Sequence, residues 1–324
     1  MGGVNSDRAQ KQNREGMVKR SRVVKIIEVY GVLVTLSLIW GLAFVAIKML
    51  EPMISPVNLT LLRWFVAGAA FLILLPIFGR SKVPVEKRDL LRLLIVSFAN
   101  VVAYHLTLNY SEGSIDAGLA TLLVAMGPIF IVAISALLLR ERHGRMIYLA
   151  ILLAFAGALI LFFGTVKTAG SSTIPGILEG IGTALSYAVF AVFSKPLVQK
   201  FGARAFTIWV GLIGTAMLLP LLSGSFVSQV LRLPMSGWIA ILYLSLLSTV
   251  LGYMLFYTMI EKGGVAKVSI QLYLIPVVGV AGGALFLGES VTAYTILGGA
   301  VMLIAVGLTT VKSKFPMIKR KAAE

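Results

Sequence analysis

The sequence predicts an all-α integral membrane protein, in which ten transmembrane helices form two inverted five-helix repeats around a central cavity. Three observations predict this fold class: the composition, the spacing of long apolar runs, and a pattern that recurs in the second half of the chain. Of the 324 residues, 58% are hydrophobic and only 13% are charged, whereas soluble proteins carry about 25% charged residues. Lipid is therefore the expected solvent for most of the chain.

Ten apolar segments are long enough to cross a bilayer, because its hydrocarbon core of roughly 30 Å requires about 20 residues of helix. The connections between them are short and leave no room for a folded domain outside the membrane. The expected spans are approximately 29–49, 58–79, 90–110, 115–139, 146–166, 174–197, 204–224, 236–260, 265–288 and 290–311.

The distribution of basic residues predicts the orientation, since short cytoplasmic loops of membrane proteins are enriched in Lys and Arg. If the N-terminus is cytoplasmic, nearly all of the 29 Lys and Arg residues lie on the cytoplasmic side; the exceptions are Lys48, Arg63, Lys167 and Arg232. We therefore expect a multi-pass protein of the plasma membrane with two cytoplasmic basic tails, 1–28 and 312–324. The N-terminal tail does not have the pattern of a secretory signal peptide.

Several functional classes are excluded by composition and missing motifs. The net charge of +16 is spread between apolar runs rather than gathered on one face, which argues against a nucleic-acid partner. The chain has no Cys, and His105 has no acidic cluster beside it, so we expect no metal site and no cofactor. Motifs of intramembrane enzymes and of ATP-driven pumps are also missing, which predicts that the chain is not an enzyme.

A proline followed thirteen residues later by a glutamate occurs twice, as Pro128 with Glu141 and as Pro276 with Glu289. Such self-similarity indicates internal duplication, with repeats at 29–166 and 174–311. Because each repeat has an odd number of spans, the second enters the membrane from the opposite side, as in many secondary transporters. Further corresponding pairs are Trp64 and Trp209, Pro76 and Pro220, Ser97 and Ser245, Val102 and Val250, and Glu112 and Glu261.

The first span contains Ser37-Leu-Ile-Trp40-Gly41, and the paired glutamates end the sequences Leu139-Arg140-Glu141 and Leu287-Gly288-Glu289. Together with the two five-helix repeats, these features resemble the EamA family of the drug/metabolite transporter superfamily. The resemblance covers nearly all of the chain outside its tails. It implies a ten-helix permease, often an exporter of amino acids or other small metabolites, with a cavity lined mainly by helices 1, 3, 4, 6, 8 and 9. A homodimer is left open.

Polar and aromatic side chains at helical spacing predict the lining of the cavity, because lipid does not favour a polar face. The same polar groups could instead hydrogen-bond between packed helices, and His105 could bind substrate, relay a proton or serve packing. The candidate substrate-binding residues are Trp40, Phe44, Asn100, Tyr104, His105, Thr107, Asn109, Tyr187, Phe190, Ser194, Tyr253, Tyr257 and Gln271.

Pro128 and Pro276 are predicted to break or bend their helices, because proline removes a backbone donor. These bends could be hinges or could set a packing angle. Arg63, Lys48 and Glu179 lie within about two turns of the outer interface, where long side chains can snorkel to water. Alternatively, Glu179 pairs with Arg63 or Lys48 and gates the outer side. Glu289 is expected to cap the helix that follows it.

These features together predict a secondary carrier that exports small metabolites such as amino acids by alternating access between the repeats. The alternative left open is a structural or sensory membrane protein that does not transport. A tightly packed apolar interface between the repeats would favour that alternative.

Overall fold

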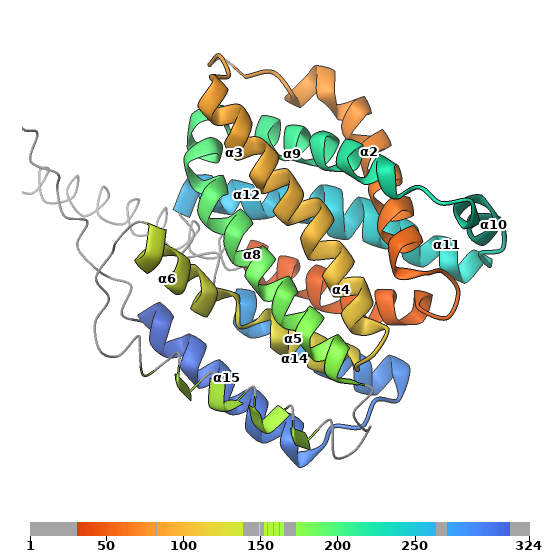
Figure 1. Ribbon diagram of the computed structural model, residues 1–324, viewed down its shortest axis with the longest axis vertical. Coiled ribbons are helices and arrows are strands. Elements are labelled where there is room, and N and C mark those ends of the chain that lie inside the picture. The colour runs from red at the N-terminus through yellow and green to blue at the C-terminus, as the bar shows by residue number, and fades with distance from the viewer. Residues whose placement is uncertain are drawn as a thin grey trace, which may run out of the picture.

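The protein is a bundle of long helices in its computed structural model (Figure 1), which describes residues 31–81, 83–138, 173–263 and 271–311 and scattered positions between 149 and 164. All secondary structure in these residues is helical. Seven described helices are long and apolar enough to cross a bilayer, and two shorter apolar helices, Leu274–Leu287 and Ala293–Ala305, fall where the ninth and tenth spans were expected. Within the expected span 146–166 the structure describes only scattered positions, and these are helical.

The first half begins with the helix Gly31–Leu50. The next span, α2, starts at Pro56 after Ser55, whose hydroxyl accepts a hydrogen bond from the Asn58 amide at 3.4 Å. Proline suits this first position, where no backbone donor is needed. The described elements that follow are α2 (Pro56–Phe78), α3 (Lys87–Ser97), the π-helix η1 (Phe98–Ala103), α4 (Tyr104–Glu112), α5 (Ala117–Val124) and α6 (Gly127–Leu138).

The second half contains one short helix, α10, that the sequence does not predict, lying in the connection before the eighth span. Two of its spans also contain π-helical segments. The described elements are α8 (Ile174–Phe201), α9 (Ala203–Leu218), the 3-10 turn η3 (Leu219–Leu221), α10 (Ser225–Leu231), α11 (Met235–Leu242), the π-helix η4 (Tyr243–Leu251), α12 (Gly252–Gly263), α14 (Gln271–Gly282), the π-helix η5 (Gly283–Leu287) and α15 (Ala293–Val311).

The two prolines predicted to break helices behave differently. The fourth span is interrupted at Ala125 and Met126, and Pro128 lies in the first turn of α6 after this break. Pro276, by contrast, lies inside α14, which continues to Gly282. At the break, an added Cβ on Gly127 would lie 2.6 Å from the Tyr187 ring, so glycine permits the close approach of α6 to α8.

The helices meet around α8, which packs against α3, α4, α5 and α6 (Figure 1). Other contacts also join the halves of the sequence: α2 packs against α9 and η4, and α5 packs against α14. The centre of the molecule is therefore built from helices of both halves.

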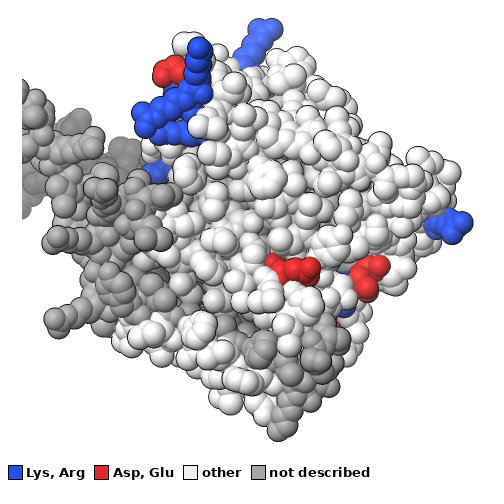
Figure 2. Space-filling view, viewed as in Figure 1, with Lys and Arg blue, Asp and Glu red and all other residues white. Residues whose placement is uncertain are grey.

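The outer surface is apolar between the ends of the helices. Large side chains such as Ile73 (72% exposed) and Leu285 (79% exposed) face outward, as expected for contact with lipid. Figure 2 shows Lys and Arg grouped at the N-terminal end of α3, separated by a broad uncharged face from the acidic side chains lower on the molecule.

Candidate functional site: a central aromatic chamber

A small chamber lies where the helix Gly31–Leu50 meets α2, α4, α8, η4 and α12. Its volume is about 20 Å³, measured as the space open to the centre of a water molecule, which is room for about one ordered water. We call it the central chamber. It is lined by Trp40, Ala43, Phe44, Ile47, Arg63, Tyr104, His105, Leu108, Tyr187, Phe190, Ser248 and Tyr253.

Aromatic rings close the central chamber. Phe190 lies 5.0 Å from Tyr187 and 5.8 Å from Tyr104, measured between ring centroids, and both pairs are edge to face. Trp40 lies 5.4 Å from Tyr253. Such separations are typical of favourable aromatic pairs. The structure therefore represents a closed centre, and a solute larger than water fits only if these rings move apart.

Arg63 is the charged residue of the central chamber and is 4% exposed. Its Nε donates to Thr249 Oγ1 at 2.8 Å, and its Nη2 donates to Ser248 Oγ at 3.2 Å. Both acceptors belong to the π-helix η4, so a side chain of the first half is held by the second half. The expectation that Arg63 snorkels to the outer interface is wrong, because the guanidinium is buried and directed inward.

Trp40 also bonds to η4, with its Nε1 donating to the Ser248 carbonyl oxygen at 3.0 Å. This contact depends on Gly252, since an added Cβ there would lie 2.6 Å from the same Nε1. π-Helical segments are frequent at functional sites. Here η4 presents the Ser248 carbonyl to Trp40 and the hydroxyls of Ser248 and Thr249 to Arg63.

His105 brings an unused polar atom to the central chamber. Its Nδ1 lies 2.9 Å from the Asn100 carbonyl oxygen, and because a carbonyl only accepts, Nδ1 carries the proton. The other ring nitrogen, Nε2, is buried without a hydrogen-bond partner in the described structure. Buried polar atoms are normally satisfied, so this nitrogen is a candidate acceptor for a ligand.

The sequence model of the EamA-like transporter family matches residues 29–163 and 174–311. The chain belongs to the EamA-like transporter family. It is therefore a multi-pass membrane transporter of small molecules rather than an enzyme.

Relatives of this EamA chain are named as transporters or efflux pumps. An uncharacterized transporter of Archaeoglobus fulgidus is 30% identical over 82% of this chain and 93% of its own length. A probable amino-acid metabolite efflux pump of Escherichia coli is 28% identical over 84% of this chain and 92% of its own. A solved crystal structure, 16% identical, aligns over 88% of this chain and 98% of that chain with a TM-score of 0.59, which shows a shared fold.

Seven of the residues predicted to bind substrate do line the central chamber of this EamA protein: Trp40, Phe44, Tyr104, His105, Tyr187, Phe190 and Tyr253. The sequence did not place Arg63 or Ser248 there. One signal for Arg63 was available, because a charge inside an apolar span is costly and tends to face the protein interior.

Other predicted binding residues are engaged elsewhere in helix packing. Asn100 Nδ2 donates to the Tyr257 hydroxyl at 3.3 Å, and Asn109 Nδ2 donates to Thr60 Oγ1 at 2.8 Å. Thr107 Oγ1 accepts from Thr183 at 2.9 Å. Ser194 bonds to a carbonyl of its own helix, and the Gln271 side chain lies outside the described residues.

The predicted gate between Arg63 and Glu179 is not formed in this structure. The ion pairs in the described part of the chain are both made by Lys200, with Glu86 at 2.7 Å and with Asp89 at 2.6 Å. They lie at the end of the molecule that carries the basic residues, so an ion-pair contact joins α3 to α8 there.

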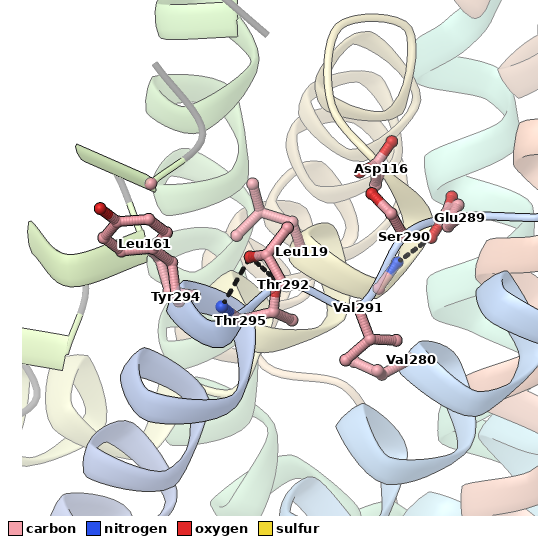
Figure 3. A pocket seen from close by; sticks show the side chains of 12 residues that line it. Asp116, Leu119, Leu161, Val280, Glu289, Ser290, Val291, Thr292, Tyr294 and Thr295 are labelled. Atoms are coloured by element: carbon pink, nitrogen blue, oxygen red, sulfur yellow. Dashed lines mark hydrogen bonds between the residues drawn. The ribbon is translucent and has the colours of Figure 1, made fainter. Parts of the chain in front are cut away.

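A second cavity of about 60 Å³ lies beside the turn between η5 and α15 (Figure 3). The sequence predicted that Glu289 caps α15, and this prediction is wrong. Glu289 instead accepts hydrogen bonds from the amides of Ala117 at 2.7 Å and Gly118 at 3.0 Å, at the start of α5. Burial raises the pKa of the Glu289 carboxyl, and these two bonds partly offset the shift. Thr292 caps α15 by accepting from the Thr295 amide at 3.1 Å.

Proposed function

We propose that the protein is a secondary permease that exports small metabolites such as amino acids from the cytoplasm across the plasma membrane. Transport proceeds by alternating access between two inverted five-helix repeats, 29–166 and 174–311, with both termini cytoplasmic. The residues lining the central chamber bind the substrate, and Pro128 and Pro276 act as the hinges of the fourth and ninth helices.

The observation that carries the proposal is the chemistry of the central chamber. A site made only for packing would be apolar and fully satisfied, because burying an unpaired polar group costs free energy. This chamber instead holds a buried cation and an unpartnered histidine nitrogen among aromatic rings. Such a combination of apolar walls with a few polar groups is typical of small-molecule sites.

The position of this chamber supports the inverted repeats. His105 and Tyr253 occupy corresponding places in the two repeats, and their ring centroids lie 6.3 Å apart. Residues related by a twofold axis approach each other only near that axis. The π-helices η1 and η4 likewise overlap in the repeat alignment, and the two segments matched by the family model fall on the two repeats.

An amino-acid-like cargo is supported by the name of the Escherichia coli relative, a probable amino-acid metabolite efflux pump. The aromatic walls suit a small solute with an apolar part, and the polar groups suit one that also has hydrogen-bonding groups.

The test is counterflow in proteoliposomes that contain the purified full-length chain, with a panel of radiolabelled amino acids, organic acids and amines. We expect uptake of at least one compound into loaded vesicles to exceed that of protein-free vesicles and to require no ATP. Trp40→Ala, which removes one wall of the central chamber, should reduce this flux. Absence of flux for the whole panel contradicts the proposal and favours a structural or sensory protein.

A further inference from the structure

The hydrogen bonds of the buried Arg63 go to neutral groups rather than to a carboxylate. A guanidinium has five N–H donors, and the two hydrogen bonds that it makes, to Thr249 and Ser248, go to neutral hydroxyls. Within the described residues no carboxylate lies at ion-pair distance from it. The buried Glu112 interacts with Arg63 electrostatically, but it forms no ion pair with it, and neither of its carboxylate oxygens has a hydrogen-bond partner.

The fold does not need a cation at this position. In the repeat alignment that pairs Trp64 with Trp209, Arg63 corresponds to Ile208, which is fully buried in α9. An aliphatic side chain therefore serves the same packing position in the other half. Because an unpaired buried charge destabilises the folded protein, its presence on one side only indicates a role in binding.

We infer that Arg63 is the group in the central chamber that binds the carboxylate of the transported solute. This inference rests on the proposed transport function and adds the substrate class: a small carboxylate with an apolar side chain. Arginine binds carboxylates through two parallel hydrogen bonds, and the N–H groups that Thr249 and Ser248 leave unused provide them. A phosphate dianion is less well matched, since Arg63 is the one Lys or Arg in the chamber lining.

The rest of the chamber fits such a solute. The rings of Trp40, Tyr187, Phe190 and Tyr253 offer an apolar surface to its side chain. The unpartnered Nε2 of His105 can accept from an N–H group close to the carboxylate. An α-amino acid with an apolar side chain satisfies both polar groups, whereas the corresponding amine leaves Arg63 without a carboxylate.

Three probes with the same phenethyl skeleton separate these contributions: L-phenylalanine, 3-phenylpropionate, which lacks the amine, and phenethylamine, which lacks the carboxylate. We expect wild-type proteoliposomes to transport the first two, and phenethylamine to compete with phenylalanine at least about tenfold more weakly. Loss of a charge-assisted contact of this kind reduces affinity by about 10- to 100-fold.

Two substitutions at Arg63 complete the test. Arg63→Gln should remove the preference for carboxylates and weaken phenylalanine binding by the same factor. Arg63→Lys keeps the charge but lacks the planar guanidinium that makes two parallel hydrogen bonds. This variant should retain the preference for carboxylates at lower affinity. The matched control is Arg204→Gln, which changes an exposed arginine that lies 5.1 Å from the Phe78 ring and should leave transport unchanged.

A thermal shift measured on each purified variant keeps the inference testable if flux is low. Phenylalanine should raise the unfolding midpoint of the wild type and of Arg204→Gln, because a ligand stabilises the state that it binds, but not that of Arg63→Gln. Transport of phenethylamine as strong as that of phenylalanine, or an unchanged preference in Arg63→Gln, overturns the inference and leaves the proposed function standing. Absence of flux for these probes and for the whole panel of compounds overturns both.

Discussion

At the scale of single residues, Glu112 shows how a duplicated side chain loses its partner. In the repeat alignment it corresponds to Glu261, whose carboxylate accepts a hydrogen bond from the Ala203 amide at 3.1 Å, at the start of α9. The matching amide in the first half belongs to Asn58, and it already donates to Ser55. Glu112 is consequently buried with both carboxylate oxygens unpartnered.

We expect Glu112→Gln to stabilise the protein. A buried carboxylate without partners pays a desolvation penalty that a neutral amide of similar shape largely avoids. The free energy of unfolding should rise by about 1 to 3 kcal/mol, which thermal unfolding in detergent would detect as a higher midpoint. Glu261→Gln is the matched control and should not stabilise, since its carboxylate has a partner. A lower midpoint for Glu112→Gln contradicts this account.

At the scale of elements, the π-helices determine which polar groups reach the centre. In η1, the carbonyl of Asn100 accepts from the side chain of His105, five residues later. In η4, the carbonyl of Leu244 accepts from Thr249, also five residues later, at 2.8 Å. A π-helical turn thus orients one chamber-lining histidine and one acceptor of Arg63. Hydrophobic periodicity does not reveal such turns, because a single π-helical turn inside a largely apolar span leaves no distinct pattern.

The cap that Glu289 provides is also an interaction between elements, because it connects the turn before α15 to the start of α5. Its carboxylate accepts two of the first amides of α5, where negative charge is favoured by the helix dipole. Glu289→Ala should lower the free energy of unfolding by about 1 to 2 kcal/mol. Thermal unfolding checks this against Glu51→Ala, an exposed carboxylate whose removal should have little effect; equal midpoints for the two variants would exclude the cap.

At the scale of the whole molecule, the sequence predicts the helical membrane fold and the family well. Long apolar runs are read directly from composition, and for that reason the described spans fall close to their expected positions. The caps were harder to predict. The amides that Glu289 contacts come from a distant part of the chain, and spacing along the sequence says nothing about which helix ends meet in space.

The central chamber was predicted only in part for a similar reason. Aromatic residues such as Tyr104 and Tyr253 were recognised by helical spacing. Asn109 and Thr107 share nearly the same helix face but bond to α2 and α8, and periodicity cannot separate a face that lines a chamber from one that packs against a neighbour. Arg63 was misplaced because its depth was judged from the end of the span rather than from the helices around it.

The proposed orientation in the membrane can be tested at the two ends of α2. The start of α2 contacts α10, since Asn58 Nδ2 donates to Gln229 at 2.8 Å, and its end contacts Arg204 through the Phe78 ring. Basic residues gather at the second of these ends (Figure 2). Because cytoplasmic loops are enriched in Lys and Arg, we expect the end near Arg204 to be cytoplasmic and α10 to be extracellular.

The chain has no Cys, so a single introduced thiol reports one position without background. Ser223→Cys lies just before α10 and Lys87→Cys at the start of α3, and both positions are exposed. A membrane-impermeant maleimide should label Ser223→Cys in intact cells and Lys87→Cys only after permeabilisation, while the unmodified chain stays unlabelled. The reverse pattern would place the basic end outside. Export through the central chamber would then run from the α10 end toward the basic end. Labelling of both positions from one side would mean that α2 does not cross the membrane, which is incompatible with a chamber enclosed between two membrane-spanning halves.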